Sequence, residues 1–381
     1  MKDKLYYLCD SNYKFDSRVQ KELISLKKIF NEVILVCWNR SKTSSTLFNT
    51  YYINNTEFKR IEIFMQAKYG GGIFNLISLI GFELKLLFLL NKLIMSHDII
   101  HACNLPCGLV TLILKMKKNI KYVYDIFDFY SDSHFSNEKS ILYKITYKLE
   151  IKIINEANTT ILCSEKRKKQ ISGSNPRELV VIHNSPNSAE IKEYKNKKYE
   201  VNKNNKVKIC YVGIIDENRP ITTLAKIISK MKNVEFYCGG FGNEEKIILK
   251  LAEENENVYF YGKMEYKDVL YLESQCDILP ALYNPTLKNH KYAAPNKFYE
   301  ALMLGKPILA FENTGIDEMI KEYNLGIVCK DSEKDIFIGL SNLIKEIEEN
   351  KIMNTKFKEI FREKFSWNIM EKKLLNIYMN I

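Results

Sequence analysis

The stretch Pro295-Asn296-Lys297-Phe298-Tyr299-Glu300-Ala301-Leu302-Met303-Leu304-Gly305-Lys306-Pro307 stands between two short apolar runs, Ile278–Ala281 and Ile308–Ala310. Proline is favoured at the very start of a helix, so the stretch predicts a helix over Asn296–Met303. An apolar run, a helix and a second apolar run are typical of a strand–helix–strand unit with parallel strands.

The same alternation continues along the whole chain. Further strands are predicted at Leu5–Cys9, Val33–Cys37, Ile99–Ala102, Tyr122–Tyr124, Thr159–Cys163, Leu179–His183, Val207–Val212, Val234–Cys238, Val258–Tyr261 and Ile327–Cys329. Residues 191–205 are rich in Lys, Asn, Tyr and Glu and lack apolar periodicity, which indicates a linker. The sequence therefore predicts an α/β fold of two doubly wound, Rossmann-like domains, residues 1–190 and 206–365, facing across a cleft.

Composition points to a reducing compartment. The nine cysteines are odd in number and scattered, and no pair has the CxxC spacing of a zinc or redox site. The N-terminus has too short an apolar run for a signal peptide. The long apolar stretch from Ile73 to Met95 contains Glu83, Lys85 and Lys92, so we expect a buried or interfacial helix rather than a membrane span. We therefore expect a cytoplasmic protein.

Charge is distributed unevenly. The net charge is +11, and residues 1–190 carry 27 Lys and Arg against 18 Asp and Glu, whereas the rest of the chain carries 30 against 28. A basic half beside a nearly neutral half indicates an anionic partner for the first half. We expect no nucleic-acid partner.

Lys297 and Glu300 lie three residues apart, so both face one side of the first helical turns. A helix N-terminus, where Asn296 lies, attracts anions, and Lys297 adds a positive charge. Glu300 offers two oxygens to a pair of ribose hydroxyls. A phosphate bound by Lys297 and a ribose bound by Glu300 would together make up half of a nucleotide. The alternative is an amphipathic helix whose charged side chains are merely solvated. A Lys-x-x-Glu spacing without any further motif would favour that alternative.

Two glycine turns strengthen the nucleotide interpretation. Tyr211-Val212-Gly213 ends a predicted strand, and Arg219 follows before the next helix. Cys238-Gly239-Gly240-Phe241-Gly242 ends the next strand. Glycines allow backbone to approach a ligand closely, so Gly213, Gly240 and Gly242 are candidate nucleotide-binding residues.

With these three segments in this order, nearly the whole chain resembles the large retaining glycosyltransferase family with the GT-B fold, often labelled group 1 or family four. The resemblance implies that Glu300 holds the ribose and that Arg219 and Lys297 bind the diphosphate of a UDP- or GDP-linked sugar. It implies that this nucleotide sugar is the substrate, with no separate cofactor. It also implies that the final helix, within residues 366–381, packs back on the first domain.

The chain departs from that family at two positions. The first glutamate of the E-x7-E element is replaced by Tyr292, so the contact to the donor sugar is altered. Where many relatives read Tyr-Asp-x-His-Glu, this chain reads Tyr124-Asp125-Ile126-Phe127-Asp128, and the histidine is lost. Asp125 and Asp128 are candidates for the acceptor side, Asp125 also for catalysis.

Asp16 and Arg18 follow the first strand and are further acceptor-side candidates; a helix cap beside a surface arginine is the alternative. No D-x-D sequence occurs, so we expect no metal site, with Arg219 and Lys297 neutralising the diphosphate instead.

Lys144, Lys148 and Lys152 recur every fourth residue on the predicted helix Ile141–Glu156. Tyr143, Tyr147 and Ile151 form the adjoining stripe. This composition predicts attachment to an anionic membrane surface, with merely solvated lysines as the alternative.

The sequence as a whole predicts a metal-independent hexosyltransferase that moves a sugar from a nucleotide sugar to a glycan or polyprenyl-linked acceptor, in surface polysaccharide or glycoconjugate synthesis. A sugar-nucleotide epimerase on the same fold and a catalytically inactive nucleotide-binding scaffold are the alternatives.

Overall fold

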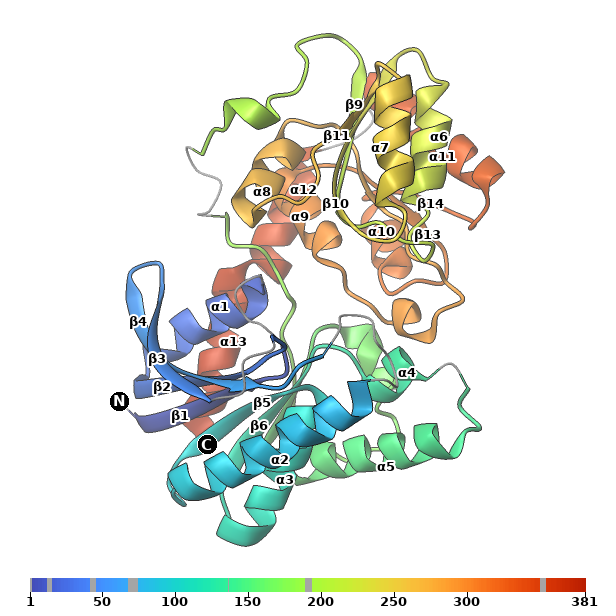
Figure 1. Ribbon diagram of the computed structural model, residues 1–381. Helices are drawn as coiled ribbons and strands as arrows, with labels where there is room; N and C mark the ends of the chain where they lie inside the picture. The colour runs from blue at the N-terminus through green and yellow to red at the C-terminus, as the bar shows by residue number, and fades with distance from the viewer. Residues whose placement is uncertain are drawn as a thin grey trace. The chain divides into compact units, whose positions relative to one another are not determined.

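The computed structural model describes residues 2–11, 16–41, 46–67, 75–135, 137–188, 194–349 and 354–381. The chain divides into two compact units (Figure 1). The first comprises Met1–His183 and Met370–Ile381, and the second comprises Asn184–Ile369. Strands and helices alternate in both, so each unit is of the predicted α/β class.

The first unit is built on one eight-stranded sheet with the order β3-β4-β2-β1-β5-β6-β7-β8. Leu5 of the central strand β1 pairs with Val33 on one side and Ile99 on the other, both in parallel register. The strands are β1 (Lys2–Cys9), β2 (Phe30–Asn39), β3 (Leu47–Ile53), β4 (Thr56–Phe64), β5 (Ile99–Cys103), β6 (Lys121–Ile126), β7 (Thr159–Leu162) and β8 (Leu179–Val181).

The edge hairpin β3–β4 was not predicted from the sequence, and β3 is antiparallel to β4. Its turn is Asn54-Asn55, and both residues have positive φ, 46° and 63°. Asparagine tolerates this left-handed region, which two-residue hairpin turns require. The sheet is therefore mixed rather than purely parallel.

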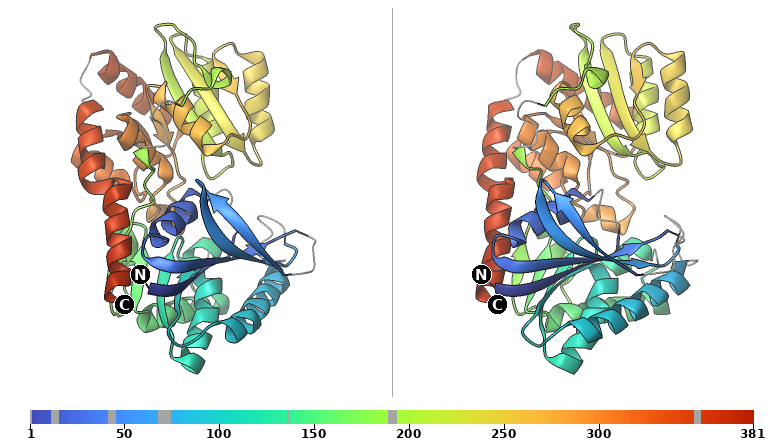
Figure 2. Two further views of the ribbon diagram at one scale, coloured as in Figure 1. Left: turned by 90° about the vertical axis from the view of Figure 1, so that its left-hand side faces the viewer. Right: turned by 60° about the vertical axis from the view of Figure 1, so that its left-hand side comes forward.

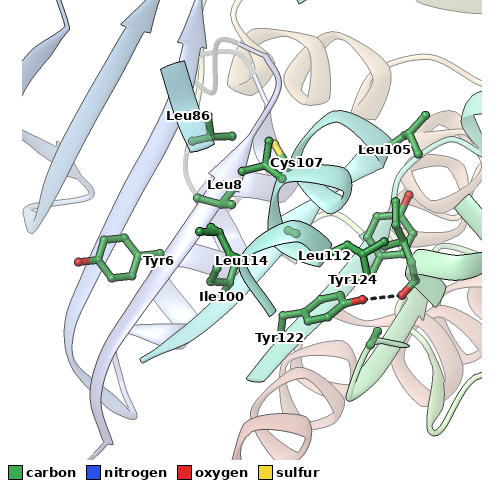
Figure 3. Close-up of a cluster of buried hydrophobic side chains, with 14 of the residues drawn as sticks. Tyr6, Leu8, Leu86, Ile100, Leu105, Cys107, Leu112, Leu114, Tyr122 and Tyr124 are labelled. Carbon is green, nitrogen blue, oxygen red and sulfur yellow. Dashed lines mark hydrogen bonds between the residues drawn. The ribbon is translucent and has the colours of Figure 1, made fainter. Parts of the chain in front are cut away.

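Helices cover both faces of this sheet (Figure 2). The helices of the first unit are α1 (Ser17–Leu26), α2 (Leu76–Leu93), α3 (Asn104–Lys118), α4 (Tyr130–His134), α5 (Ile141–Glu156) and the greater part of α13 (Trp367–Asn380). On one face, Leu8, Ile100 and Tyr124 of the strands pack with Leu86 of α2 and Leu114 of α3 in a buried core (Figure 3). On the other face, Phe30 makes an edge contact with Tyr378 of α13.

A carboxyl group is buried beneath the first unit's helical layer. Glu150 of α5 accepts hydrogen bonds from the backbone N–H of Tyr130 and from the hydroxyl of Tyr124. No basic side chain neutralises it in these contacts, and burial raises its pKa to about 8. Glu150 is therefore predominantly protonated at neutral pH.

The raised pKa of Glu150 makes stability depend on pH. Since the pKa rises from 4.5 to about 8 on folding, the folded state holds the extra proton between these values. The free energy of unfolding should therefore fall as pH rises through this window, by up to about 1.4 kcal/mol per pH unit. Urea unfolding at several pH values should give a flatter curve for Glu150→Gln; parallel curves would contradict the assignment.

The second unit contains two three-stranded parallel sheets, of order β11-β10-β9 and β12-β13-β14. They meet through a parallel bridge between Ile209 and Ile278. The strands are β9 (Val207–Ile214), β10 (Val234–Phe241), β11 (Val258–Phe260), β12 (Leu279–Ala281), β13 (Ile308–Phe311) and β14 (Gly326–Cys329). The helices are α6 (Ile221–Ser229), α7 (Glu245–Glu254), α8 (Tyr266–Ser274), α9 (Asn296–Leu304), α10 (Asp317–Tyr323), α11 (Glu333–Glu348) and α12 (Asn354–Ile360).

Part of the predicted linker, residues 191–205, belongs to the packed second unit. Residues 191–193 lie outside the described residues. Lys197–Tyr199 forms a 3-10 turn, and the buried Tyr199 ring meets Tyr261 edge-on. Asn202 donates to Glu235 and Tyr259, so this segment is fastened to β10 and β11.

Candidate functional site

Helix α9 carries the two residues on which the nucleotide interpretation depends. Pro295 precedes the helix in extended conformation, and Gly305 ends it at φ 72°, in the left-handed region that glycine favours. Lys297 and Glu300 both lie on the buried side, and Lys297 Nζ is 3.1 Å from Glu300 Oε2. The pair is therefore buried rather than solvated.

A second carboxylate, which sequence reasoning missed, completes this pair. Glu273 of α8 lies 2.5 Å from Lys297 Nζ through its Oε1 and is fully buried. Its other oxygen has no hydrogen-bond partner among the described residues. A signal existed in the sequence, because Glu273 occupies the apolar face of α8 with Val269 and Leu272, where a charge requires a partner.

The cluster contains one ammonium group and two carboxyl groups. Burial, and next the charge of Glu300, raise the pKa of Glu273 to about 8, although Lys297 opposes the shift. Burial alone would lower the pKa of Lys297, but Glu273 and Glu300 raise it well above its ordinary value. Lys297 therefore remains a cation, and an ammonium group has three N–H donors. With two donors directed to Glu273 and Glu300, a third is left for a ligand oxygen.

Arg219 supplies a second cation in the same unit. It follows β9 in the turn before α6, and its guanidinium donates to Asp216 Oδ2 at 2.9 Å. The guanidinium carbon lies 5.3 Å from the centre of the Tyr283 ring. Burial raises the pKa of Tyr283, and the charges of Arg219 and Lys297 oppose this shift, so Tyr283 lies near both cations. Tyr283 was also missed by sequence reasoning.

The glycine turns have a structural reason that the sequence did not reveal. A Cβ atom added at Gly240 would lie 1.8 Å from the carbonyl oxygen of Gly213, and one at Gly242 would lie 2.1 Å from that of Ile215. Both glycines also have positive φ. Gly240 is therefore required by the close approach of β10 to β9, and Gly242 by the close approach of the segments that follow these strands. Any contact with a ligand would be additional.

Tyr292 stands where the resembled family has a glutamate. It ends the turn Lys288–Lys291 and is half-buried. The loop before α9 is held tightly, because a Cβ added at Gly315 would lie 1.8 Å from the carbonyl oxygen of Ala293. Asn296 is the first residue of α9 and is also half-buried.

In the first unit, Arg18 and Asp125 lie in a buried ionic network. Arg18 Nη2 is 2.5 Å from Asp125 Oδ1, and Arg18 Nε is 3.0 Å from Glu22 Oε1. His101 Nε2 lies 3.4 Å from Asp125 Oδ2. All four side chains are buried. Arg18 is therefore not a surface arginine, and these contacts favour a structural role for Asp125.

Asp16, Asp128 and Phe127 make separate contacts in the first unit. Asp16 caps α1 by accepting from the backbone N–H groups of Arg18 and Val19. Asp128 accepts from Arg167 at 2.7 Å, and more than half of its side chain is exposed. The Arg18 guanidinium carbon lies 4.4 Å from the centre of the Phe127 ring. Phe127 thus contacts the cation of the buried ionic network by a cation–π interaction.

One group of potential metal ligands occurs within the described part of the chain. The donor atoms of His101, Cys103 and Asp125 lie within 4.8 Å of one another. Burial raises the pKa of the Cys103 thiol well above its ordinary value, and Arg18 already neutralises Asp125. A protonated thiol and a neighbouring guanidinium both disfavour a cation, so we assign these residues to the buried network.

Comparison with known proteins places these features in a family context. Residues 192–364 match the family described as glycosyl transferases group 1. The chain is 24% identical over 259 residues to an uncharacterized glycosyltransferase of Methanocaldococcus jannaschii, a match that covers 65% of this chain and 64% of that protein. The match thus spans less than two thirds of the length of this curated relative.

Solved structures match over nearly the full chain. Sucrose-phosphate synthase of Thermosynechococcus elongatus has a TM-score of 0.74 at 13% identity, covering 100% of this chain and 99% of that one. Anabaena HepE in complex with UDP-glucose has a TM-score of 0.69 at 13% identity, covering 99% and 100%.

These likenesses define a protein of the GT-B class, with two Rossmann-like domains. This confirms the predicted fold class. Within it, the stretch that matches the group 1 glycosyltransferase family lies in the second unit and contains Arg219, Glu273, Lys297 and Glu300.

Proposed function

We propose that this protein transfers a hexosyl group from a UDP- or GDP-linked sugar to a glycan or polyprenyl-linked glycan, with retention of configuration and without a metal ion. Surface polysaccharide or glycoconjugate synthesis is the proposed process. Arg219 and Lys297 bind the diphosphate in this proposal, and Glu300 accepts hydrogen bonds from the ribose. The nucleotide sugar is a substrate, and no separate cofactor takes part.

The observation that carries the proposal is the cluster around Lys297 in the group 1 domain. Lys297 is a buried cation fixed by two carboxyl groups, and Arg219 lies in the same neighbourhood around Tyr283. Two buried or half-buried cations suit a leaving diphosphate, whose charge grows in the transition state. Anabaena HepE has been solved with UDP and with UDP-glucose, which supports a nucleotide sugar as the donor.

Release of free nucleotide tests the proposal. Purified protein should liberate UDP or GDP from one member of a panel of nucleotide sugars when an acceptor extract is added. A sugar-nucleotide epimerase would instead alter the donor sugar without an acceptor. Binding without any turnover would favour an inactive scaffold, the alternative to which Phe127 and Tyr292 point. Product analysis by NMR would then establish retention.

Glu300→Gln should weaken nucleoside diphosphate binding by about 1.5–3 kcal/mol, since a hydrogen bond to a charged group has this value. Calorimetric titration with UDP and GDP measures the change. Glu348→Gln, an exposed residue of α11, is the matched control and should bind as the wild type does. Unchanged affinity of the Glu300 variant would remove the ribose assignment.

Chelation by EDTA should leave the transfer rate within about twofold of the untreated enzyme, because Arg219 and Lys297 supply the charge that Mg²⁺ supplies elsewhere. Initial rates with and without EDTA measure this. Complete loss of activity, with recovery on addition of Mn²⁺ or Mg²⁺, would overturn metal independence.

We further propose that the protein works on the cytoplasmic face of the cell membrane as a peripheral protein. The basis is the row of Lys144, Lys148 and Lys152 on α5, all of which are exposed. No helix among the described residues is long and apolar enough to cross a bilayer. A lipid-linked acceptor would suit this location.

A further inference from the structure

Helices α2, α3 and α5 form one layer on the same face of the eight-stranded sheet (Figures 1 and 2). α3 packs between the other two, and the buried side of α2, formed by Phe82, Leu86 and Leu90, belongs to the core. The outward sides of the three helices therefore make one continuous surface of the first unit. We call this surface the basic-apolar face.

The outward side of α2 has an apolar stripe along most of its length. Ile77, Leu84 and Phe88 are 83%, 61% and 65% exposed, and Leu76 and Ile80 are also exposed. The spacing of 77, 80, 84 and 88 places these residues on one stripe of the helix. Eighteen residues span about 27 Å. Single exposed apolar residues are ordinary, but a contiguous stripe indicates a binding surface.

The charges on the basic-apolar face are mainly of one sign. Across α2, α3 and α5, which the structure describes in full, the exposed charged side chains are Lys85, Lys92, Lys117, Lys144, Lys148 and Lys152. Glu150 is buried and Glu83 is half-buried, and burial raises the pKa of Glu83 to about 7. Glu156, at the end of α5, has a side chain that is 43% exposed, but its carboxylate is paired with Lys115 at 3.1 Å. The face therefore presents mainly cations and apolar groups.

The apolar border of the α5 lysines differs from the stripe predicted from the sequence. Tyr143 is buried, and Tyr147 and Ile151 pack against the core, so that stripe does not face outward. Ile141, Leu142 and Ile145, at the start of α5, are exposed instead. Exposed apolar groups therefore accompany the lysines, but most of them come from α2.

This composition fits an anionic lipid bilayer better than a protein partner. Protein interfaces are generally poor in lysine, whereas interfacial helices combine a strong apolar stripe with flanking lysines. Lys92 shows the required arrangement, because its ammonium group lies 4.1 Å from the centre of the Phe88 ring at the end of the stripe. A lysine charge thus lies directly beside the apolar stripe, where it makes a cation–π contact with Phe88.

The geometry points to the basic-apolar face as the lipid-binding surface, with the α2 stripe inserted at the level of the headgroups and the lysines on lipid phosphates. The inference rests on the proposed peripheral location and names the inserting element. The lysines and the apolar stripe would contribute to lipid binding in different ways, because salt screens the attraction of the lysines but does not weaken apolar insertion.

Sedimentation with vesicles of equal parts phosphatidylglycerol and phosphatidylcholine tests the two contributions. Ile77→Gln/Leu84→Gln/Phe88→Gln should lower the partition coefficient by about a hundredfold at any salt concentration. Lys144→Glu/Lys148→Glu/Lys152→Glu should lower it by about a hundredfold or more at low salt. The matched control, Ile247→Gln/Leu249→Gln/Phe337→Gln, changes exposed apolar residues of the second unit and should bind as the wild type does.

Insertion itself is measured with a tryptophan reporter. Leu84→Trp should be quenched by brominated lipids in anionic vesicles, and Phe337→Trp should not be, after subtraction of the signal of the native tryptophans. An unquenched Leu84→Trp, or a wild type that ignores anionic vesicles, would overturn the inference. A dimer that the Gln variant dissociates, without vesicle binding, would instead make the face an interface between copies. UDP and GDP titrations of the same proteins test the proposed donor site independently.

Discussion

Replacing Lys297 by methionine should lower kcat by about a hundred- to a thousandfold, because the variant loses a preorganised cation at the leaving diphosphate. Methionine fills a similar volume without the charge. The substitution also leaves Glu273 and Glu300 as neighbouring buried carboxyl groups without their shared cation. Breaking a buried pair in this way costs about 3–5 kcal/mol of stability unless the carboxyl groups take up protons.

A double variant separates the two effects. Lys297→Met/Glu273→Gln removes the cation and one buried carboxylate together, so it should recover much of the lost stability and none of the lost activity. Thermal unfolding and initial rates of nucleotide release are the measurements. If the double variant transferred sugar at the wild-type rate, Lys297 would serve only to neutralise Glu273, and the catalytic assignment would fail.

Replacing Arg18 by methionine should destabilise the first unit by about 3–5 kcal/mol. Arg18 is the guanidinium between the buried carboxyl groups of Glu22 and Asp125. Their other contacts among the described residues are with the neutral hydroxyl of Tyr7 and the ring of His101. For a unit of this size, the melting temperature should fall by roughly 10 °C.

Arg177→Met is the matched control, since Arg177 is an exposed arginine of the same unit and its nearest carboxylate oxygen is 3.8 Å away. It should melt within a degree or so of the wild type. Adding Glu22→Gln and Asp125→Asn to Arg18→Met should restore much of the stability, because no unpaired charge then remains. Equal melting temperatures of the Arg18 and Arg177 variants would show that the buried ionic network contributes nothing to the stability of the first unit.

The order of elements was predictable because most strands are buried on both sides and appear as continuous apolar runs. β1 and β6 are of this kind. The hairpin β3–β4 escaped prediction because β3 lies at the edge of the sheet with most of its residues exposed. An exposed edge strand lacks the apolar run on which the other predictions depended.

Of the candidate site, only the residues that lie close together in the sequence could be predicted. Lys297 and Glu300 share one turn of α9, whereas Glu273 reaches Lys297 from 24 residues earlier on α8. Likewise, Arg18 pairs with Asp125 across 107 residues. The sequence offered Arg18 as an acceptor-side residue because nothing local reveals such a partner. Long-range pairing depends on how the elements pack, which periodicity does not specify.

The closing helix bears on how the chain is synthesised. The Tyr378 hydroxyl contacts His101 Nδ1 at 2.5 Å, and Glu371 accepts from Ser25, so the first unit is completed by residues that are translated only after the whole second unit. The second unit is one continuous segment and has no such delay. At typical elongation speeds the nascent first unit waits roughly 10–40 s between the emergence of His183 and the arrival of α13. During that interval the polar and aromatic groups that α13 later covers are exposed to chaperones, which makes the N-terminal half the vulnerable part of the newborn chain.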